Sequence, residues 1–312
     1  MSKFEIKIAQ PRGFCAGVDR AIEIVEQALK IFGSPIYVRH EIVHNKRVVT
    51  DLKEKGTIFI EDINDVPDDS ILIFSAHGTG KELLKKARNR KLKVIDAACP
   101  LVTKVHMEAI KYSEKGYSIV LIGHEGHIEV EGTMGQLPEG EITLVETVQD
   151  VDKLGFQNDE NVAVITQTTL SVDDTFYIME ALKNKYKNLI KPKADDICYA
   201  TQNRQDAVKD LASECDLILV LGAKNSSNSN RLKELGEKCG VPSFLIDDAS
   251  QFCPEWIEDV ESIGVTAGAS APQVLVEELI ETLIKLGGDF PKAIKGKVEK
   301  ISFPLPIEIR NV

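Results

Sequence analysis

The sequence has no run of the roughly 20 apolar residues that a membrane-spanning helix needs. It is also short of positive charge, because 38 Lys and Arg residues stand against 49 Asp and Glu residues and the formal net charge is -11. Surfaces that bind nucleic acid or anionic membranes concentrate Lys and Arg, so we expect neither partner. No secretory hydrophobic stretch opens the chain, and we expect a cytoplasmic, reducing location.

None of the six cysteines stands in a C-x-x-C pair, which argues against a local zinc knuckle or a thioredoxin-type motif. In a large intracellular chain, cysteines are more often thiols or metal ligands than a disulfide framework. We interpret Cys215, Cys239 and Cys253 as buried small hydrophobic residues. Any metal site must therefore be assembled from distant segments.

What the sequence does contain is a regular alternation of strand-like and helix-like segments. Apolar runs at residues 71–74, 119–122 and 217–221 predict strands that are buried on both faces. Apolar residues at helical spacing over 18–29, followed by Gly33, predict a helix that ends at this glycine. The alternation is typical of an α/β fold with mostly parallel sheets.

Two serines predict helix starts. Ser171, three residues before Asp174, resembles a capping box. Ser270 stands two places ahead of Pro272, and we expect it to cap the apolar helix that follows.

Three of the cysteines share a pattern at longer range. Each follows a strand-like segment, at Cys15, Cys99 and Cys198. A polar residue comes 28 or 29 residues after each of them, in the order His44, His127 and Ser226. A second polar loop follows, with His77, Thr168 and Ser270. Because ligands of open parallel sheets bind beyond the carboxyl ends of the strands, the spacing predicts three α/β units that share one pocket.

Three thiolates from separate segments suit an iron–sulfur cluster or a zinc ion. A cubane cluster normally takes four cysteines, so three would leave one iron open to a substrate oxygen. The polar loops hold hydrogen-bond donors of short reach, and strand-to-helix turns add backbone N–H groups, which together favour a phosphate or diphosphate. The alternatives are buried structural cysteines and, at residues 224–231, a solvated loop.

A carboxylate also stands among these loops. Glu129 lies two residues beyond His127, where it could protonate a metal-bound hydroxyl as it leaves. Glu125 and Glu131 are close competitors, and the residues alone do not separate the three.

The motifs that carry these residues resemble the 4-hydroxy-3-methylbut-2-enyl diphosphate reductase family. The resemblance runs in order from about residue 10 to residue 275, in PRGFCAGVDRAI, YVRHEIVHN, IFSAHG, CPLVTKVH, GHIEVEGTMGQ, TQTTLSVDDT, DDICYATQNRQ, KNSSNSNRL and GVTAGASAP. It implies three pseudo-symmetric α/β/α domains, with mostly parallel sheets, around a central iron–sulfur cluster. The implied domains are residues 1–97, 98–195 and 196–283, with a C-terminal extension at 284–312.

The resemblance also implies roles for single residues. The ligands of one [4Fe-4S] cluster per chain are Cys15, Cys99 and Cys198. The substrate-binding residues are His44, His77, His127, Thr168, Ser226, Ser227, Asn228 and Ser270. Glu129 is the proton donor, and Thr168 lies near the substrate hydroxyl as a second catalytic residue.

The implied reaction is the reductive dehydroxylation of 4-hydroxy-3-methylbut-2-enyl diphosphate to isopentenyl and dimethylallyl diphosphate, with two electrons and two protons. The substrate oxygen binds the unique iron, and a ferredoxin or flavodoxin supplies the electrons. We expect a monomer. Two other functions fit the same residues: a zinc-dependent hydrolase, and a non-catalytic sensor that carries a cluster.

The sequence departs from the family pattern at three places. Ala98 stands where threonine is common, Ile128 where proline is frequent, and Thr79-Gly80 where Val-Ser is familiar. None of these removes a ligand or a proton donor, so they bear on rate rather than on reaction type.

Overall fold

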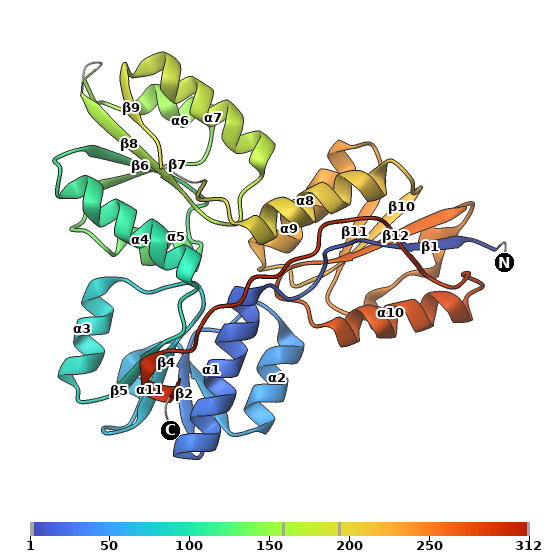
Figure 1. Ribbon diagram of the computed structural model, residues 1–312, viewed down its shortest axis with the longest axis horizontal. Coiled ribbons are helices and arrows are strands. Elements are labelled where there is room, and N and C mark those ends of the chain that lie inside the picture. The colour runs from blue at the N-terminus through green and yellow to red at the C-terminus, as the bar shows by residue number, and fades with distance from the viewer. Residues whose placement is uncertain (1–2, 158–159, 193–194, 311–312) are drawn as a thin grey trace. The chain divides into compact units, whose positions relative to one another are not determined.

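The computed structural model describes residues 3–157, 160–192 and 195–310. It contains three parallel β-sheets with helices packed on them, which confirms the predicted α/β class (Figure 1). Within the described residues, no helix is both long and apolar enough to span a membrane.

The chain divides into two compact units. The first unit comprises residues 1–19, 44–50 and 199–302, and the second comprises residues 20–43, 51–198 and 303–312. Each unit is thus assembled from segments that are far apart in the sequence. The domain boundaries implied by the resemblance stay a prediction.

The first unit is built on a five-stranded sheet of order β11-β10-β12-β1-β13. Its strands are β1 (Glu5–Ile8), β10 (Leu217–Leu221), β11 (Ser243–Ile246), β12 (Ser262–Ala267) and β13 (Lys292–Ala293). Its helices are α8 (Tyr199–Ala212), α9 (Ser227–Lys238) and α10 (Gln273–Lys285), with the 3-10 turns η2 (Ala249–Gln251) and η3 (Pro254–Ile257). The N-terminal strand β1 pairs with β12, so the start of the chain completes a sheet made largely from its last third.

Alternate side chains of β10 enter two separate cores, as expected for a strand covered on both faces. Leu219 packs in the core that contains Leu279 of α10. Ile218 packs in the core that contains Leu211 of α8 and Leu232 of α9.

The second unit contains two four-stranded sheets, of order β3-β2-β4-β5 and β7-β6-β8-β9. The strands of the former are β2 (Ile36–Arg39), β3 (Thr57–Ile60), β4 (Ile71–Phe74) and β5 (Lys93–Asp96). Those of the latter are β6 (Ser118–Ile122), β7 (Ile142–Val145), β8 (Asn161–Thr166) and β9 (Asn188–Ile190). Its helices include α3 (Lys81–Asn89), α4 (Pro100–Ser113), α5 (Ile128–Met134), α6 (Val148–Lys153), α7 (Val172–Lys185) and α11 (Ile307–Arg310), with the 3-10 turn η1 (Ile63–Asp65).

Two further helices, α1 (Ala16–Phe32) and α2 (Lys46–Glu54), begin in the first unit and continue into the second. In the sheet centred on β6, Val120 packs in the core of α7, and Leu121 packs in the core of α4 and α5. This sheet therefore repeats the two-sided burial seen in the first unit.

The local predictions from sequence meet different outcomes. The three apolar runs form β4, β6 and β10, and α1 ends before Gly33, whose φ of 77° suits a helix stop. Ser171 caps α7 by accepting a hydrogen bond from the Asp174 N–H, as predicted. The prediction for Ser270 is wrong, because Pro272 is the N-cap of α10 and caps it without a side-chain hydrogen bond.

Candidate active site

The three candidate cluster ligands share one local setting. Cys15 and Cys198 directly precede α1 and α8, and Cys99 is the N-cap of α4. No cysteine of the described residues is in a disulfide. Because a helix N-terminus presents backbone N–H groups and a positive dipole end, each position favours a thiolate or another anion. Of the three cysteines predicted to be buried, Cys215 is buried and Cys253 is partly buried, but the prediction is wrong for Cys239, which is exposed at the end of α9.

Cys15 is the candidate ligand whose electrostatics the structure defines best. Burial raises the pKa of its thiol, while the positive charge of Arg204 and the N–H groups of Val18 and Gly17 act in the opposite direction. A neutral thiol is therefore favoured by the buried setting alone. The neighbouring donors and the cation lower the cost of a negative charge on this sulfur.

In the first unit, His44 is linked to two predicted site loops. The Ser270 hydroxyl donates a hydrogen bond to the His44 backbone oxygen at 2.9 Å. Nδ2 of Asn225 lies 3.2 Å from Nδ1 of His44. Ser270 therefore joins two loops instead of capping a helix, which explains why the sequence prediction failed.

The loop at the start of α9 is tied to the loop after β12. Ser226 caps α9 by accepting a hydrogen bond from the Ser229 N–H at 3.4 Å, and Ser227 is the first residue of the helix. Asn228 is buried, and its Oδ1 accepts a hydrogen bond from the Ala269 N–H at 2.9 Å. These contacts fix the polar residues at the carboxyl end of β10 and β12, as predicted for an open parallel sheet.

The Cys15 loop lies at the same end of this sheet. The Gly13 N–H donates to the Ala267 oxygen at 3.0 Å. Gly13 has a φ of 66°, and a Cβ atom there would lie 3.2 Å from the Ala271 oxygen. Glycine is therefore favoured both by the backbone angle and by the close approach of the next loop.

In the second unit, Glu129 and Thr168 form a buried pair. The Thr168 N–H donates to Oε1 of Glu129 at 2.6 Å, and the Thr168 hydroxyl donates to Oε2 at 3.0 Å. The Cys198 N–H donates to the backbone oxygen of Thr168 at 3.0 Å. One candidate ligand is thus hydrogen-bonded to the residue that holds the candidate proton donor.

Burial separates Glu129 from its two competitors. Glu129 is 3% exposed, whereas Glu125 and Glu131 are exposed to solvent. Burial raises the pKa of Glu129 to about 7, against the lowering effect of the two hydrogen bonds from Thr168. This carboxyl group can therefore hold a proton near neutral pH, as a general acid must.

Two histidines lie beside the Glu129–Thr168 pair. Nδ1 of His127 accepts a hydrogen bond from the Glu129 N–H at 3.1 Å, and His127 is the N-cap of α5. The rings of His127 and His77 meet edge to face, with centroids 6.2 Å apart. Nδ1 of His77 lies 3.1 Å from the Ser75 hydroxyl. Because Nδ1 of His127 is an acceptor in this bond, the neutral ring carries its hydrogen on Nε2.

Cys99 is hydrogen-bonded to the loop that carries His77. Its N–H donates to the backbone oxygen of Ala76 at 2.9 Å, next to His77. A continuous series of contacts therefore joins Cys99 to Cys198 through the two histidines and the Glu129–Thr168 pair.

Glycines allow the His77 loop to lie against α5. A Cβ atom on Gly132 would lie 3.0 Å from the Gly78 oxygen, and one on Gly80 would lie 3.0 Å from Cα of Gly135. Gly80 is one of the departures from the family pattern, and in this chain it lies in backbone-to-backbone contact. The short, glycine-rich loops are what bring His77 and His127 together.

The comparisons with known proteins agree with this geometry. The family model described as LytB protein matches residues 6–284. The chain belongs to the LytB protein family. The matched range contains all the predicted cluster ligands and site residues.

Relatives of this LytB chain are similar over almost their whole length. The 4-hydroxy-3-methylbut-2-enyl diphosphate reductase of Chromohalobacter salexigens is 57% identical over 310 residues, with 98% of each chain covered. That of Ectopseudomonas mendocina is 58% identical over 308 residues, again with 98% of each covered. Because these relatives are reductases, the LytB chain is an oxidoreductase.

A solved structure supports the same assignment. The E-1-hydroxy-2-methyl-but-2-enyl-4-diphosphate reductase from Plasmodium falciparum is 40% identical, with a TM-score of 0.95. The match covers 99% of the LytB chain and 97% of the Plasmodium chain.

The cysteines offer the donor atoms that an iron–sulfur cluster takes, because its irons are bound by Cys thiolates. Within the described ranges, no three His, Cys, Asp or Glu side chains lie close enough together to hold one metal ion. The chemistry of the donor set, three thiols outside disulfides that each stand at a helix N-terminus, suits an anionic iron–sulfur cluster.

The sequence did not single out two residues that contact the candidate histidines. Asn225 contacts His44, and Ser75 contacts His77. Both stand inside motifs of the family resemblance. Asn225 directly precedes the predicted site residue Ser226, and Ser75 is two residues before His77. That proximity is the signal that could have identified them.

Proposed function

We propose that this chain catalyses the reductive dehydroxylation of 4-hydroxy-3-methylbut-2-enyl diphosphate to isopentenyl and dimethylallyl diphosphate. The observation that carries the proposal is the buried Glu129–Thr168 pair, hydrogen-bonded to Cys198, in a chain whose family relatives bear the name of this reductase. The reaction consumes two electrons and two protons and releases the hydroxyl group as water.

Cys15, Cys99 and Cys198 would hold one [4Fe-4S] cluster. When bound, the cluster supplies single-electron transfer and a Lewis-acidic iron for the substrate oxygen. The contribution of the chain is to place the three thiolates, to exclude water and to supply the proton. Each of these cysteines stands directly before the first residue of a helix, where the backbone N–H groups favour the thiolate anion.

Glu129 delivers the proton to the departing oxygen. Its carboxyl group is buried and holds a pKa of about 7, so a large fraction is protonated at neutral pH. Thr168 orients the group through its N–H and hydroxyl. As a second catalytic residue it would lie near the substrate hydroxyl. General acid catalysis of this kind contributes roughly 100-fold to 10,000-fold.

The diphosphate binds to donors of short reach in the polar loops. The donors that the family resemblance implies are His44, His77, His127, Ser226, Ser227, Asn228 and Ser270. The rings of His77 and His127 meet edge to face. Many directional hydrogen bonds hold the diphosphate far from the reacting carbon, and this binding energy is used to orient the C–O bond.

Electrons come singly from a ferredoxin or flavodoxin, and the chain acts as a monomer. The reaction takes up two electrons, so this external donor would supply two electrons in each turnover.

Anaerobic purification followed by iron, sulfide and zinc analysis tests the cluster. We expect about four irons per chain, with broad visible absorption, and stoichiometric zinc would instead indicate a hydrolase. Turnover of the hydroxylated diphosphate with a reduced dye then separates an enzyme from a cluster-carrying sensor.

Cysteine variants assign the ligands. Cys15→Ala, Cys99→Ala and Cys198→Ala should each impair the cluster, whereas Cys239→Ala, at an exposed cysteine, should leave the iron content unchanged. A normal iron content in the first three variants would contradict the proposed ligand set.

A further inference from the structure

Each of the three helices that follow a candidate ligand carries a cation five or six residues beyond the cysteine. The cations are Arg20 in α1, Lys104 in α4 and Arg204 in α8. None of them stood out in the sequence, because single cations on helices are common. In the structure, each one contacts the loop in front of a different cysteine.

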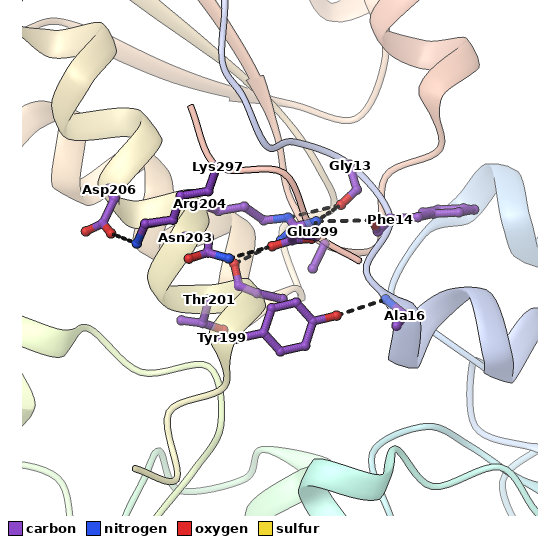
Figure 2. A network of polar contacts seen from close by, with 12 residues as sticks. Gly13, Phe14, Ala16, Tyr199, Thr201, Asn203, Arg204, Asp206, Lys297 and Glu299 are labelled. Carbon is purple, nitrogen blue, oxygen red and sulfur yellow. Dashed lines mark hydrogen bonds and ion pairs between the residues drawn. The ribbon is translucent and has the colours of Figure 1, made fainter. Parts of the chain in front are cut away.

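Arg204 holds the loop that precedes Cys15. Its side chain is fully buried, and its guanidinium donates to the Gly13 oxygen through Nε at 3.0 Å and Nη2 at 2.7 Å. Nη2 also donates to the Phe14 oxygen at 3.1 Å. Figure 2 shows the guanidinium pointing from α8 to these two carbonyl groups. The same helix offers the Tyr199 hydroxyl, which accepts from the Ala16 N–H at 3.3 Å.

Arg20 holds the loop that precedes Cys99. Its Nη1 donates to the Ala98 oxygen at 3.0 Å and to the Ala97 oxygen at 3.4 Å. The loop is braced from within as well, because the Ala98 N–H donates to the Asp96 carboxylate at 2.9 Å.

Lys104 holds the loop that precedes Cys198. Its Nζ donates to Oδ1 of the buried Asp196 at 2.9 Å and to the Asp195 oxygen at 3.3 Å. The other carboxylate oxygen of Asp196 accepts a hydrogen bond from the Thr166 N–H at 3.0 Å, at the end of β8. Asp196 therefore fixes this loop to α4 through the ion pair and to the end of β8 through the Thr166 N–H.

These contacts follow one cyclic rule along the chain. Arg20, which follows Cys15, is hydrogen-bonded to the loop before Cys99. Lys104, which follows Cys99, is hydrogen-bonded to the loop before Cys198. Arg204, which follows Cys198, is hydrogen-bonded to the loop before Cys15. We propose that Arg20, Lys104 and Arg204 are positioning residues for the iron–sulfur cluster: each one fixes the backbone that aims the next thiolate and adds a positive charge that favours the reduced cluster. This inference rests on the proposed function.

The C-terminal extension supports two of the three cations. Glu299 pairs with Arg204, with Oε1 3.1 Å from Nη1, and it also accepts from Asn203 at 2.9 Å. Figure 2 shows the extension running beside α8, where Lys297 pairs with Asp206. The Pro304 oxygen accepts from Nε of Arg20 at 2.8 Å. The C-terminal extension contributes no site motif, but it contacts Arg204 and Arg20, which in turn are hydrogen-bonded to cysteine loops.

The test compares cation-to-methionine variants with matched controls on the same helices. The test variants are Arg20→Met, Lys104→Met and Arg204→Met. The controls are Lys30→Met, Lys111→Met and Lys209→Met, which remove a lysine from the last turn of α1, α4 and α8. Two quantities are measured on anaerobically reconstituted protein: the rate of iron release to a chelator, and the midpoint potential from a redox titration followed by electron paramagnetic resonance.

We expect roughly tenfold faster iron release in each test variant, because each loses hydrogen bonds from a charged donor to a ligand loop. We also expect a lower midpoint potential, since a nearby cation favours the more negative, reduced cluster. Arg20→Lys, Lys104→Arg and Arg204→Lys should keep the potential of the unmodified protein. Where a methionine variant fails to fold, the conservative variant of the same residue is tested in its place. Its iron-release rate is then compared with that of the lysine control on the same helix.

Test variants that match the lysine controls in both quantities would overturn the inference. Faster iron release with an unchanged potential would overturn it too, because that pattern marks a general loss of stability. If unmodified protein binds about four irons while the variants match the controls, only this inference fails. Unmodified protein that binds no iron would overturn the proposed function itself.

Discussion

The Glu129 carboxyl group receives two hydrogen bonds from Thr168, one from the backbone N–H at 2.6 Å and one from the side-chain hydroxyl at 3.0 Å. These bonds stabilise the ionised carboxylate, whereas burial favours the protonated acid. Burial has the larger effect, and the pKa of Glu129 is raised to about 7. The balance between the two makes this residue able to give up a proton and to regain it near neutral pH.

Replacing Glu129 by glutamine should abolish most turnover while the cluster and substrate binding are kept. The amide preserves the shape of the side chain but cannot donate a proton as an acid, so we expect a loss of roughly 100-fold or more in kcat. The exposed Glu131, in the first turn of the same helix, provides the control variant Glu131→Gln. Normal turnover by Glu129→Gln would show that the proton comes from elsewhere.

The pH dependence of turnover should report the pKa of Glu129. An acid donates only while it is protonated, so kcat should be high below pH 7 and should decrease as the pH rises through about 7. This decrease should be missing from the residual activity of Glu129→Gln. A pH–rate profile under single-turnover conditions measures it, because product release cannot then mask the proton transfer.

The same group links stability to pH. Its pKa of about 7 in the folded chain exceeds the ordinary value of 4.5, so the folded state binds more protons between these two pH values. The contribution is complete below pH 4.5 and is lost as the pH rises through about 7; it is on the order of 3 kcal/mol. Denaturant unfolding of the apoprotein at several pH values should show this decline in the parent and not in Glu129→Gln.

Removal of the Thr168 hydroxyl should shift the pH dependence upwards. Thr168→Val keeps the side-chain shape and the backbone N–H but deletes the bond to Oε2 of Glu129. Because that bond lowers the pKa of Glu129, its loss should raise the pKa and move the decrease in kcat to higher pH. Thr168→Ser keeps a hydroxyl and should leave the profile near that of the parent. Identical profiles for the valine and serine variants would argue against this role.

A methyl group on Gly78 should destabilise the second unit. Its Cβ atom would lie 2.6 Å from Cε1 of the buried His106, at a φ of 83°. Gly140→Ala is the matched control, because Gly140 has a φ of 88° and no atom lies within 4 Å of its added Cβ. We expect about 1 kcal/mol of destabilisation for Gly140→Ala from the backbone angle, and about 2–4 kcal/mol for Gly78→Ala from angle and clash together. Equal free energies of unfolding would show that His106 moves aside freely.

Much of the fold and part of the site were predictable from local patterns. Apolar runs identified β4, β6 and β10, since a strand buried on both faces has few polar residues at any position. The cysteines and the polar loops could be predicted as a site because strand ends in a parallel sheet meet at one edge. Chain order alone was enough for these features.

Other features depended on residues far away in the chain. The sequence placed Glu125, Glu129 and Glu131 on an equal footing, and only the packing around α5 buries one of them. Ser270 resembled a helix cap, but it donates to the backbone of His44, which lies more than 200 residues earlier. A serine hydroxyl can bond to either partner, and the tertiary contact decides which one lies within reach.

The amino-acid sequence by itself determined the α/β elements, the three cysteines after strand-like segments and the family. The tertiary structure decided which carboxyl group is buried, that β1 joins the sheet of β12, and which loop each helix cation holds. Periodicity and composition act over a few residues, whereas burial and hydrogen-bond partners depend on segments that the chain brings together only when it folds.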